Sequence, residues 1–139
     1  MSGNQAKRGS FLLMTVLGLF LSACGGGGSA GTDGGSQLPP KILTWSAPTR
    51  YSDNSTLDPA TELDAFEIYV NTSGSFANSD APVAYVQAVD PGSGQVTTEF
   101  NLANLGPFLS PGVPYRVSLR AVALTGARSD FSPAASFSF

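Results

Sequence analysis

The chain has 139 residues, with 7 Lys+Arg, 10 Asp+Glu, one Cys and no His, and its formal net charge at pH 7 is −3. This length suits one small domain, the single Cys excludes an internal disulfide, and the lack of His excludes His-based zinc sites and His-dependent catalytic triads. Because an acidic chain without a basic cluster binds phosphate poorly, we predict no nucleic-acid partner, and we also expect no catalytic, cofactor-binding or metal-binding residues.

Residues 1–23 are predicted to be a signal peptide. Lys7 and Arg8 precede an uncharged apolar run at 11–21. A helix that crosses a membrane needs about 20 apolar residues, so this shorter run is typical of the central part of a signal peptide. A signal-anchor helix is disfavoured because four glycines follow Cys24 and end the run. Removing Lys7 and Arg8 leaves 5 basic and 10 acidic residues, so the mature chain would carry a net charge of −5 (5 minus 10).

The only cysteine stands at the end of this apolar run. Leu21-Ser22-Ala23-Cys24 resembles the lipobox of bacterial lipoproteins. The resemblance implies cleavage before Cys24, a diacylglycerol on its thiol, and a further acyl chain such as palmitate on its amine. Several acyl chains give durable membrane anchoring, where one gives only marginal binding. The alternative is an ordinary secretory signal with a chance cysteine.

The residue after the lipobox cysteine bears on localisation. In Gram-negative lipoproteins an Asp at that position usually retains the protein at the inner membrane, and this chain has Gly25 there. We therefore expect a cell-envelope protein, anchored by lipid on Cys24 in the outer membrane if the source is Gram-negative. The sequence leaves open whether the domain faces the periplasm or the cell surface.

Residues 24–40 are predicted to form the lipidated cysteine and a flexible tether. Seven of the 13 residues at 25–37 are Gly, and none is a large apolar residue. Such a linker has a mean reach of roughly 20 Å. A glycine-rich phosphate-binding loop would need a strand before it and a helix after it, so we prefer the tether.

Residues 41–139 are predicted to be an all-β domain. The clearest strand lies at 115–123, where alternate residues are apolar and Arg116, Ser118 and Arg120 are predicted to face solvent. Residues 65–70 alternate in the same way. Shorter strands are predicted near 43–47, 83–89, 100–102 and 137–139, separated by turn residues. Two antiparallel sheets packed face to face would bury these apolar faces.

The order of these runs resembles that of a fibronectin type III domain, an immunoglobulin-like sandwich. Trp45 in LTWSAP is similar to the tryptophan of the family's second strand, and 66–70 is similar to its third strand. The most specific match is LSPGVPY, with Leu109, Pro111, Gly112 and Tyr115 in the family's L-x-P-G-x-x-Y motif. The resemblance implies a tyrosine corner, in which the Tyr115 hydroxyl bonds to nearby backbone and Leu109 packs near its ring.

The resemblance covers about 41–139 and has two departures. The family's first strand is missing, or reduced to a remnant near 37–40, which would leave one sheet edge open. Pro39 and Pro40 could protect that edge against aggregation. Residues 106–108 also read as an insertion before the L-x-P-G turn.

Three groups of residues have alternative functional interpretations. The acidic residues at 53–64 could hold calcium, although their spacing fits a solvated acidic loop better. Residues 128–130 read Arg-Ser-Asp where some type III domains carry an integrin-binding Arg-Gly-Asp, and we interpret them as a polar loop. Four loop aromatics could form a partly exposed contact patch: Tyr51, Phe76, Tyr85 and Phe108.

The sequence therefore predicts the cellular location of the protein more clearly than its activity. We expect a membrane-anchored lipoprotein that presents a non-enzymatic type III-like module to an envelope or surface protein or to a glycan. The alternative is a structural accessory subunit of an envelope assembly. An enzyme is disfavoured, since two acids across a cleft, as in glycosidases, are hard to place on a sandwich of this size.

Overall fold

A computed structural model describes residues 38–139 of the chain. The predicted signal peptide, the lipobox with Cys24, and the tether up to residue 37 lie outside the described residues. The elements in chain order are β1 (Ile42–Thr44), α1 (Pro59–Glu62), β2 (Leu63–Asn71), β3 (Ala84–Gln87), β4 (Glu99–Asn101), the 3-10 helix η1 (Leu102–Phe108), β5 (Tyr115–Ala123) and β6 (Ala135–Phe137).

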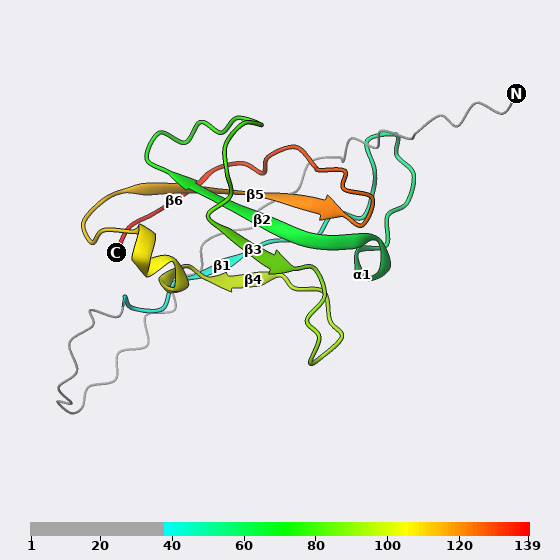
Figure 1. The fold of residues 1–139 in the computed structure, drawn as a ribbon, viewed down its shortest axis with the longest axis horizontal. Helices are drawn as coiled ribbons and strands as arrows, with labels where there is room; N and C mark the ends of the chain where they lie inside the picture. The colour runs from blue at the N-terminus through cyan, green and yellow to red at the C-terminus, as the bar shows by residue number, and fades with distance from the viewer. Residues whose placement is uncertain (1–37) are drawn as a thin grey trace, which may run out of the picture.

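The strands form two antiparallel sheets, as Figure 1 shows. One sheet has two strands in the order β1-β4, and the other has four in the order β3-β2-β5-β6. The two longest strands, β2 and β5, pair in the centre of the larger sheet, with Ile68 opposite Leu119 and Phe66 opposite Ala121. The prediction of an all-β domain with two antiparallel sheets is therefore confirmed for the described residues.

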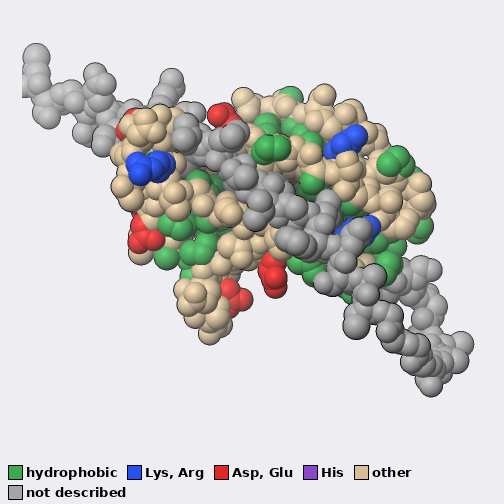
Figure 2. All heavy atoms as spheres, turned by 180° about the vertical axis from the view of Figure 1, so that it is seen from behind, with side chains coloured by type: hydrophobic (Ala, Val, Ile, Leu, Met, Phe, Trp, Pro, Cys, Tyr) green, Lys and Arg blue, Asp and Glu red, His purple; other side chains and the backbone are tan. Residues whose placement is uncertain are grey.

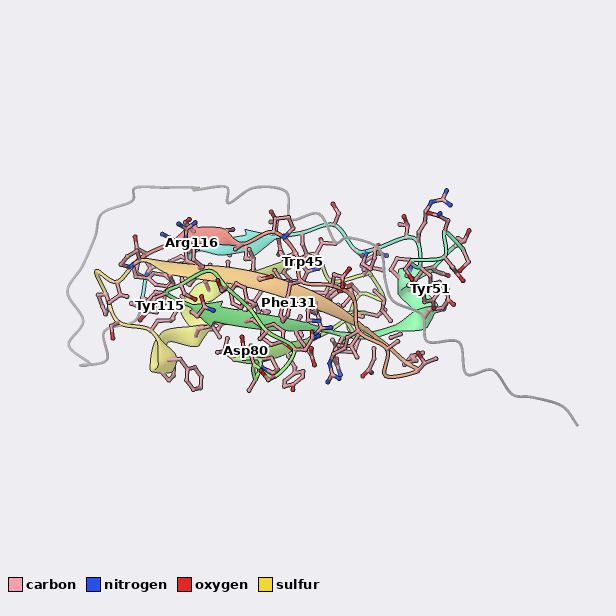
Figure 3. All side chains as sticks on the ribbon, turned by 90° about the horizontal axis from the view of Figure 1, so that it is seen from above. Trp45, Tyr51, Asp80, Tyr115, Arg116 and Phe131 are labelled. Carbon is pink, nitrogen blue, oxygen red and sulfur yellow. The ribbon has the colours of Figure 1, made fainter. Side chains whose placement is uncertain are left out.

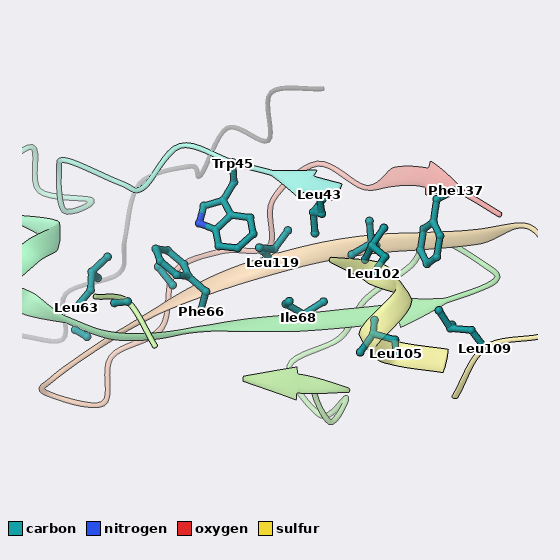
Figure 4. Close-up of a cluster of buried hydrophobic side chains, with 14 of the residues drawn as sticks. Leu43, Trp45, Leu63, Phe66, Ile68, Leu102, Leu105, Leu109, Leu119 and Phe137 are labelled. Carbon is teal, nitrogen blue, oxygen red and sulfur yellow. The ribbon is translucent and has the colours of Figure 1, made fainter. Parts of the chain in front are cut away.

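The apolar core lies between the sheets (Figure 4). Side chains from the inner faces of β2 and β5 meet Leu43 of β1 and Trp45, which follows it. The Trp45 ring packs edge-on against Phe66, with centroids 5.2 Å apart. Alternation predicted this inner face correctly, since Phe66, Ile68, Leu43 and Trp45 are all buried.

Two short helices depart from the strand pattern. Helix α1 begins at a reciprocal cap similar to a capping box, in which the Asp58 side chain accepts from the Ala60 N–H and the Glu62 carboxylate accepts from the Asp58 N–H. After β4, the Asn101 side chain accepts from the Ala103 N–H and starts η1, so the predicted strand ends before residue 102. Residues 106–108, which we predicted to be an insertion, are the last turn of η1.

The described chain has two distinct ends along its length, which Figures 1 and 3 show. The α1 end holds α1 and the turn after β5, where the Leu124 N–H donates to the Glu62 carbonyl. The η1 end holds η1, the start of β5 and Leu38, whose side chain lies beside Gly106. Strands β2 and β5 run between these ends. Within 38–139 no strand precedes β1, so a first strand of the type III kind is not present there.

Candidate interaction surfaces

The outer face of the larger sheet is largely covered, contrary to the sequence prediction. Alternation placed Ser118 and Arg120 toward solvent, yet Ser118 is fully buried and Arg120 is only 8% exposed. Glu67, on the same face of β2, is 1% exposed. The prediction is wrong because two loops, 72–83 and 124–134, fold across this face and supply partners for its polar groups.

A buried carboxylate lies at the centre of this face. Both Glu67 carboxylate oxygens accept from the Arg128 Nε–H, at 3.0 and 3.1 Å, and the Arg128 Nη2 lies 3.0 Å from Glu67 Oε1. The Tyr69 hydroxyl donates to Glu67 Oε2 at 2.7 Å. Glu67 is therefore a buried charge with a bidentate partner and a second donor. These hydrogen bonds offset the free-energy cost of removing the carboxylate from water.

Arg120 occupies the next position across the sheet from Glu67. Its Nε–H donates to the Ser129 carbonyl at 2.7 Å and its Nη1 donates to Asn78 Oδ1 at 3.0 Å, so one guanidinium holds both loops. The ring of Phe131 lies against this guanidinium, 4.7 Å from its Cζ. Figure 3 shows Phe131 over the middle of the sheet. A cation held on an aromatic face in this way is favoured most where water is excluded.

Two serines replace regular strand pairing beside β5. The Ala121 N–H donates to the Ser129 hydroxyl and the Leu119 N–H donates to the Ser132 hydroxyl, both at 2.9 Å. In return the Ser129 N–H donates to the Ala121 carbonyl, and the Ser132 N–H donates to the Leu119 carbonyl. Each hydroxyl therefore accepts the hydrogen bond that a backbone carbonyl of a neighbouring strand would accept in a regular sheet. The Arg-Ser-Asp segment, which we predicted to be a polar loop, lies in the loop 124–134 and is docked on the sheet through Ser129.

We call Glu67, Tyr69, Arg120, Arg128 and Ser129 the outer-face network. Burial and the hydrogen bond to Glu67 raise the pKa of the Tyr69 hydroxyl to about 12, so it stays protonated at neutral pH. The hydrogen bond to Glu67 also raises the pKa of Arg128. All five side chains have partners within the domain. This network is suited to holding loops in place.

The acidic residues near α1 have structural partners. Asp53 accepts from the Ser55 N–H, Asp58 caps α1, and Glu62 accepts from the Tyr51 hydroxyl as well as from the Asp58 N–H. Among the described residues, no group of three or more acidic, Cys or His side chains could hold a metal ion. The geometry accordingly offers no support for the calcium alternative, which needs converging oxygens.

The four candidate aromatics do not form one patch. Phe76 stacks on Phe131 with centroids 5.7 Å apart, and Tyr51 packs against the core and donates to Glu62. Tyr85 and Phe108 are exposed, at 66% and 67%. Tyr85 lies on β3, opposite Glu67 in the strand register, whereas Phe108 ends η1. Sequence reasoning overlooked Leu124, which is 66% exposed at the α1 end.

The motif positions at 109–115 are brought together at the η1 end. The Ser110 N–H donates to the Tyr115 hydroxyl at 3.0 Å, a bond of the kind that a tyrosine corner requires. Gly112 has φ of +79°, which favours glycine, and its N–H donates to the Phe139 carbonyl. Leu109 and Tyr115 belong to one apolar cluster. Pro111 is exposed in the turn before Gly112.

One motif position and one sheet edge remain to be placed. Trp45 is 4% exposed, and its indole N–H has no hydrogen-bond partner among the described residues. Within 38–139, β3 pairs only with β2, so no described strand lies on its other edge. No described helix is both long and apolar enough to cross a bilayer.

Sequence signals for the outer-face network were present in the printed chain. Glu67 and Arg120 are opposite charges in the middle of the two strongest predicted strands, and they are paired in the register. Opposite charges at matched positions of two neighbouring strands indicate a cross-strand pair, but they do not indicate whether that pair is buried. The chain matches no protein-family model, and no curated protein is detectably similar to it in sequence.

Proposed function

We propose that this protein is a lipid-anchored envelope protein whose fibronectin type III-like domain binds an envelope or surface protein, or a glycan, without catalysing a reaction. The observation that carries the proposal is the order of segments. An apolar run at 11–21 ends in Leu-Ser-Ala-Cys, a glycine-rich spacer follows at once, and a β-sandwich begins at β1.

The strand pairing supports the type III part of the proposal. If β1 is the family's second strand, then β4 is the fifth, and β2, β5 and β6 are the third, sixth and seventh. Immunoglobulin-like sandwiches place the second and fifth strands in one sheet and the third, sixth and seventh in the other, as here. The bond between Ser110 and Tyr115 at the start of the sixth strand agrees with this assignment.

A binding role is favoured over catalysis by the state of the polar groups. The buried serine hydroxyls and the Glu67 carboxylate are all engaged in holding loops. A catalytic nucleophile needs instead a base within hydrogen-bond reach and room for a substrate. The outer edge of β3 can accept a strand from a partner, and such strand addition draws its affinity from backbone hydrogen bonds.

Lipid attachment is tested first. Cells that produce the full chain are fed an alkyne-tagged fatty acid, and the membrane fraction is probed for tagged protein. We expect the parent chain and a Ser29→Ala control to carry the tag and sediment with membranes, and Cys24→Ala to lose both properties. A Cys24→Ala protein that still sediments with membranes would contradict lipid anchoring at this residue.

Partner binding is tested with photo-crosslinking side chains in the full-length protein. One is placed at Gln87 on the β3 edge, and one at Thr125 at the α1 end as control. A discrete crosslinked partner at Gln87 and none at Thr125 supports a binding module. A fixed-ratio complex that survives purification favours the accessory-subunit role, and turnover of a substrate panel would overturn the proposal.

A further inference from the structure

We propose that the η1 end of the domain is a membrane-contacting surface, on which Phe108 inserts into the lipid interface and holds the α1 end away from the bilayer. This inference rests on the proposed lipid anchor at Cys24 and adds an orientation to it. Three observations about the η1 end carry it: its exposed aromatic ring, the entry point of the chain, and the distribution of charge.

Phe108 is a large apolar side chain without cover. It is 67% exposed at the last position of η1, directly after Pro107, while Leu105 of the same helix is buried in the core. The 3-10 helix thus directs Leu105 into the core and leaves Phe108 exposed to solvent. Transfer of an aromatic side chain from water to a lipid interface is favourable, so a bilayer beside this ring would be a suitable partner.

The chain enters the domain at this same end. Leu38, the first described residue, packs beside Gly106, which is two positions from Phe108. Thirteen residues lie between Cys24 and Leu38. If these behave as a Gly-rich coil, they span roughly 20 Å on average, so an anchored Cys24 keeps the η1 end close to the bilayer. Such tethering raises the local concentration of the surface, and one inserted ring is then enough to select an orientation.

Charge favours the same orientation. The η1 end carries Lys41, which donates to the Ser138 carbonyl, and Arg116, which donates to the Ser136 hydroxyl. The α1 end carries the acids of the α1 cap and its loop, including Asp58 and Glu62. In Figure 2, which views the molecule from behind, acidic side chains and one basic group lie at the α1 end, further acidic ones lie over the middle, and only basic ones lie toward the η1 end. An anionic lipid surface repels the α1 end and tolerates the η1 end.

The other two exposed apolar side chains are matched controls. Tyr85 and Leu124 are each 66% exposed, almost the same as Phe108. Tyr85 lies on β3 at the outer face, and Leu124 lies at the α1 end, where its N–H donates to Glu62. Neither adjoins Leu38, where the chain enters. If exposure alone decided membrane contact, all three positions would behave alike, whereas the proposal singles out Phe108.

The test measures which end of the lipidated protein touches lipid. The mature protein is purified with its lipid and placed in vesicles of phosphatidylethanolamine and phosphatidylglycerol that contain an acyl-chain nitroxide quencher. A single fluorophore is attached through Asn104→Cys on η1 or through Thr125→Cys at the α1 end, since both residues are exposed. An acylated Cys24 does not react with the label.

We expect strong quenching of the label at 104 and little at 125. Phe108→Ser should abolish most of the quenching at 104, whereas Tyr85→Ser should leave it unchanged. Equal quenching at both labels, or quenching at 104 that survives Phe108→Ser, would overturn the orientation. Circular dichroism of each variant checks that the sandwich is folded.

A separate readout distinguishes failure of the anchor from failure of the orientation. Flotation with the vesicles and the mass of the N-terminal peptide report whether Cys24 is acylated. Protein that floats and is acylated, but shows no preference for the η1 end, refutes only this inference. Protein without acyl chains that does not float refutes the proposed lipid anchor and the orientation with it.

Discussion

Strands β2 and β5 are covered on both faces, and the two faces are held by different forces. The inner face is apolar, with Phe66, Ile68 and Leu119 fully buried against the smaller sheet. The outer face holds Glu67 and Arg120, whose partners come from the two loops that cross it. Apolar burial is strong and non-directional, whereas a buried ion pair adds little net stability but tolerates few geometries. The inner face therefore makes the sheets associate, and the outer face fixes where the loops lie.

This contrast matters for the proposed role of the domain. Loops carry binding residues in many sandwiches, and they serve best when a rigid scaffold positions them. Here the loops at 72–83 and 124–134 are held on the sheet by Arg120 of β5, which donates a hydrogen bond to a residue in each of them. Disrupting the inner face should unfold the protein, while disrupting the outer face should loosen loops in a protein that remains folded.

The largest effect is expected on the inner face. Phe66→Ala removes a fully buried ring that packs against Trp45, and it should lower the free energy of unfolding by about 4 kcal/mol. Tyr85→Ala, on the adjacent strand but exposed, should change it by no more than about 0.5 kcal/mol. Urea unfolding followed by circular dichroism measures both. Similar losses in the free energy of unfolding for the two variants would show that Phe66 does not belong to the core.

An intermediate effect is expected from the outer-face ion pair, and it should be asymmetric. Arg128→Ala leaves the Glu67 carboxylate buried without its cation, at a cost of about 2 kcal/mol. That is below the usual value for a buried pair, since the Arg128 side chain is 50% exposed and water can replace it. Glu67→Gln keeps the shape and removes the buried charge, so it should cost about 1 kcal/mol.

The double variant decides whether that asymmetry has the stated cause. With Gln at position 67 there is no buried charge to leave unpaired, so adding Arg128→Ala should cost less than it does alone. The comparison is a double-mutant cycle on urea midpoints. Strictly additive losses would mean that Glu67 and Arg128 do not act as a pair, and the outer face would then be held mainly by its aromatic rings.

The two faces also differ in how far the sequence predicted them. The inner face follows from alternation, because Phe66, Ile68 and the apolar positions of β5 recur every second residue. The outer face does not, because its burial depends on loops that are distant in sequence, and Arg128 is 61 positions from Glu67. Period-two patterns report which side chains share a face, and they do not report what lies over it.

The candidate site positions follow the same rule. Gly112 and the bond from Ser110 to Tyr115 are local, so a seven-residue motif was enough to anticipate that contact. By contrast, the end of β4 depends on a helix cap at Asn101, where alternation alone would continue the strand. The side of the domain at which the chain enters is a property of the fold, and no sequence pattern around Leu38 indicated it.

An effect about as small as that of Glu67→Gln is expected from the Tyr69 hydroxyl, which donates to Glu67, and its pH dependence identifies it. Tyr69→Phe removes the donor to Glu67 Oε2 and should cost about 1 kcal/mol at pH 7. Because burial and this hydrogen bond raise the pKa of Tyr69 from 10.0 to about 12, its contribution is fully present below pH 10 and is lost as pH rises through about 12. The phenylalanine variant lacks that loss.

The difference in stability between the parent and Tyr69→Phe should therefore shrink between pH 10 and pH 12. Tyr51→Phe serves as the control, because burial also raises the pKa of Tyr51, but its hydroxyl donates to Glu62 outside the outer-face network. Urea midpoints at pH 7, 10 and 12 measure the trend. If the urea midpoints of the parent and of Tyr69→Phe change with pH in parallel, the titration of Tyr69 does not contribute to the pH dependence of stability. A shrinking difference would show that the polar face, unlike the apolar one, can be weakened by pH alone.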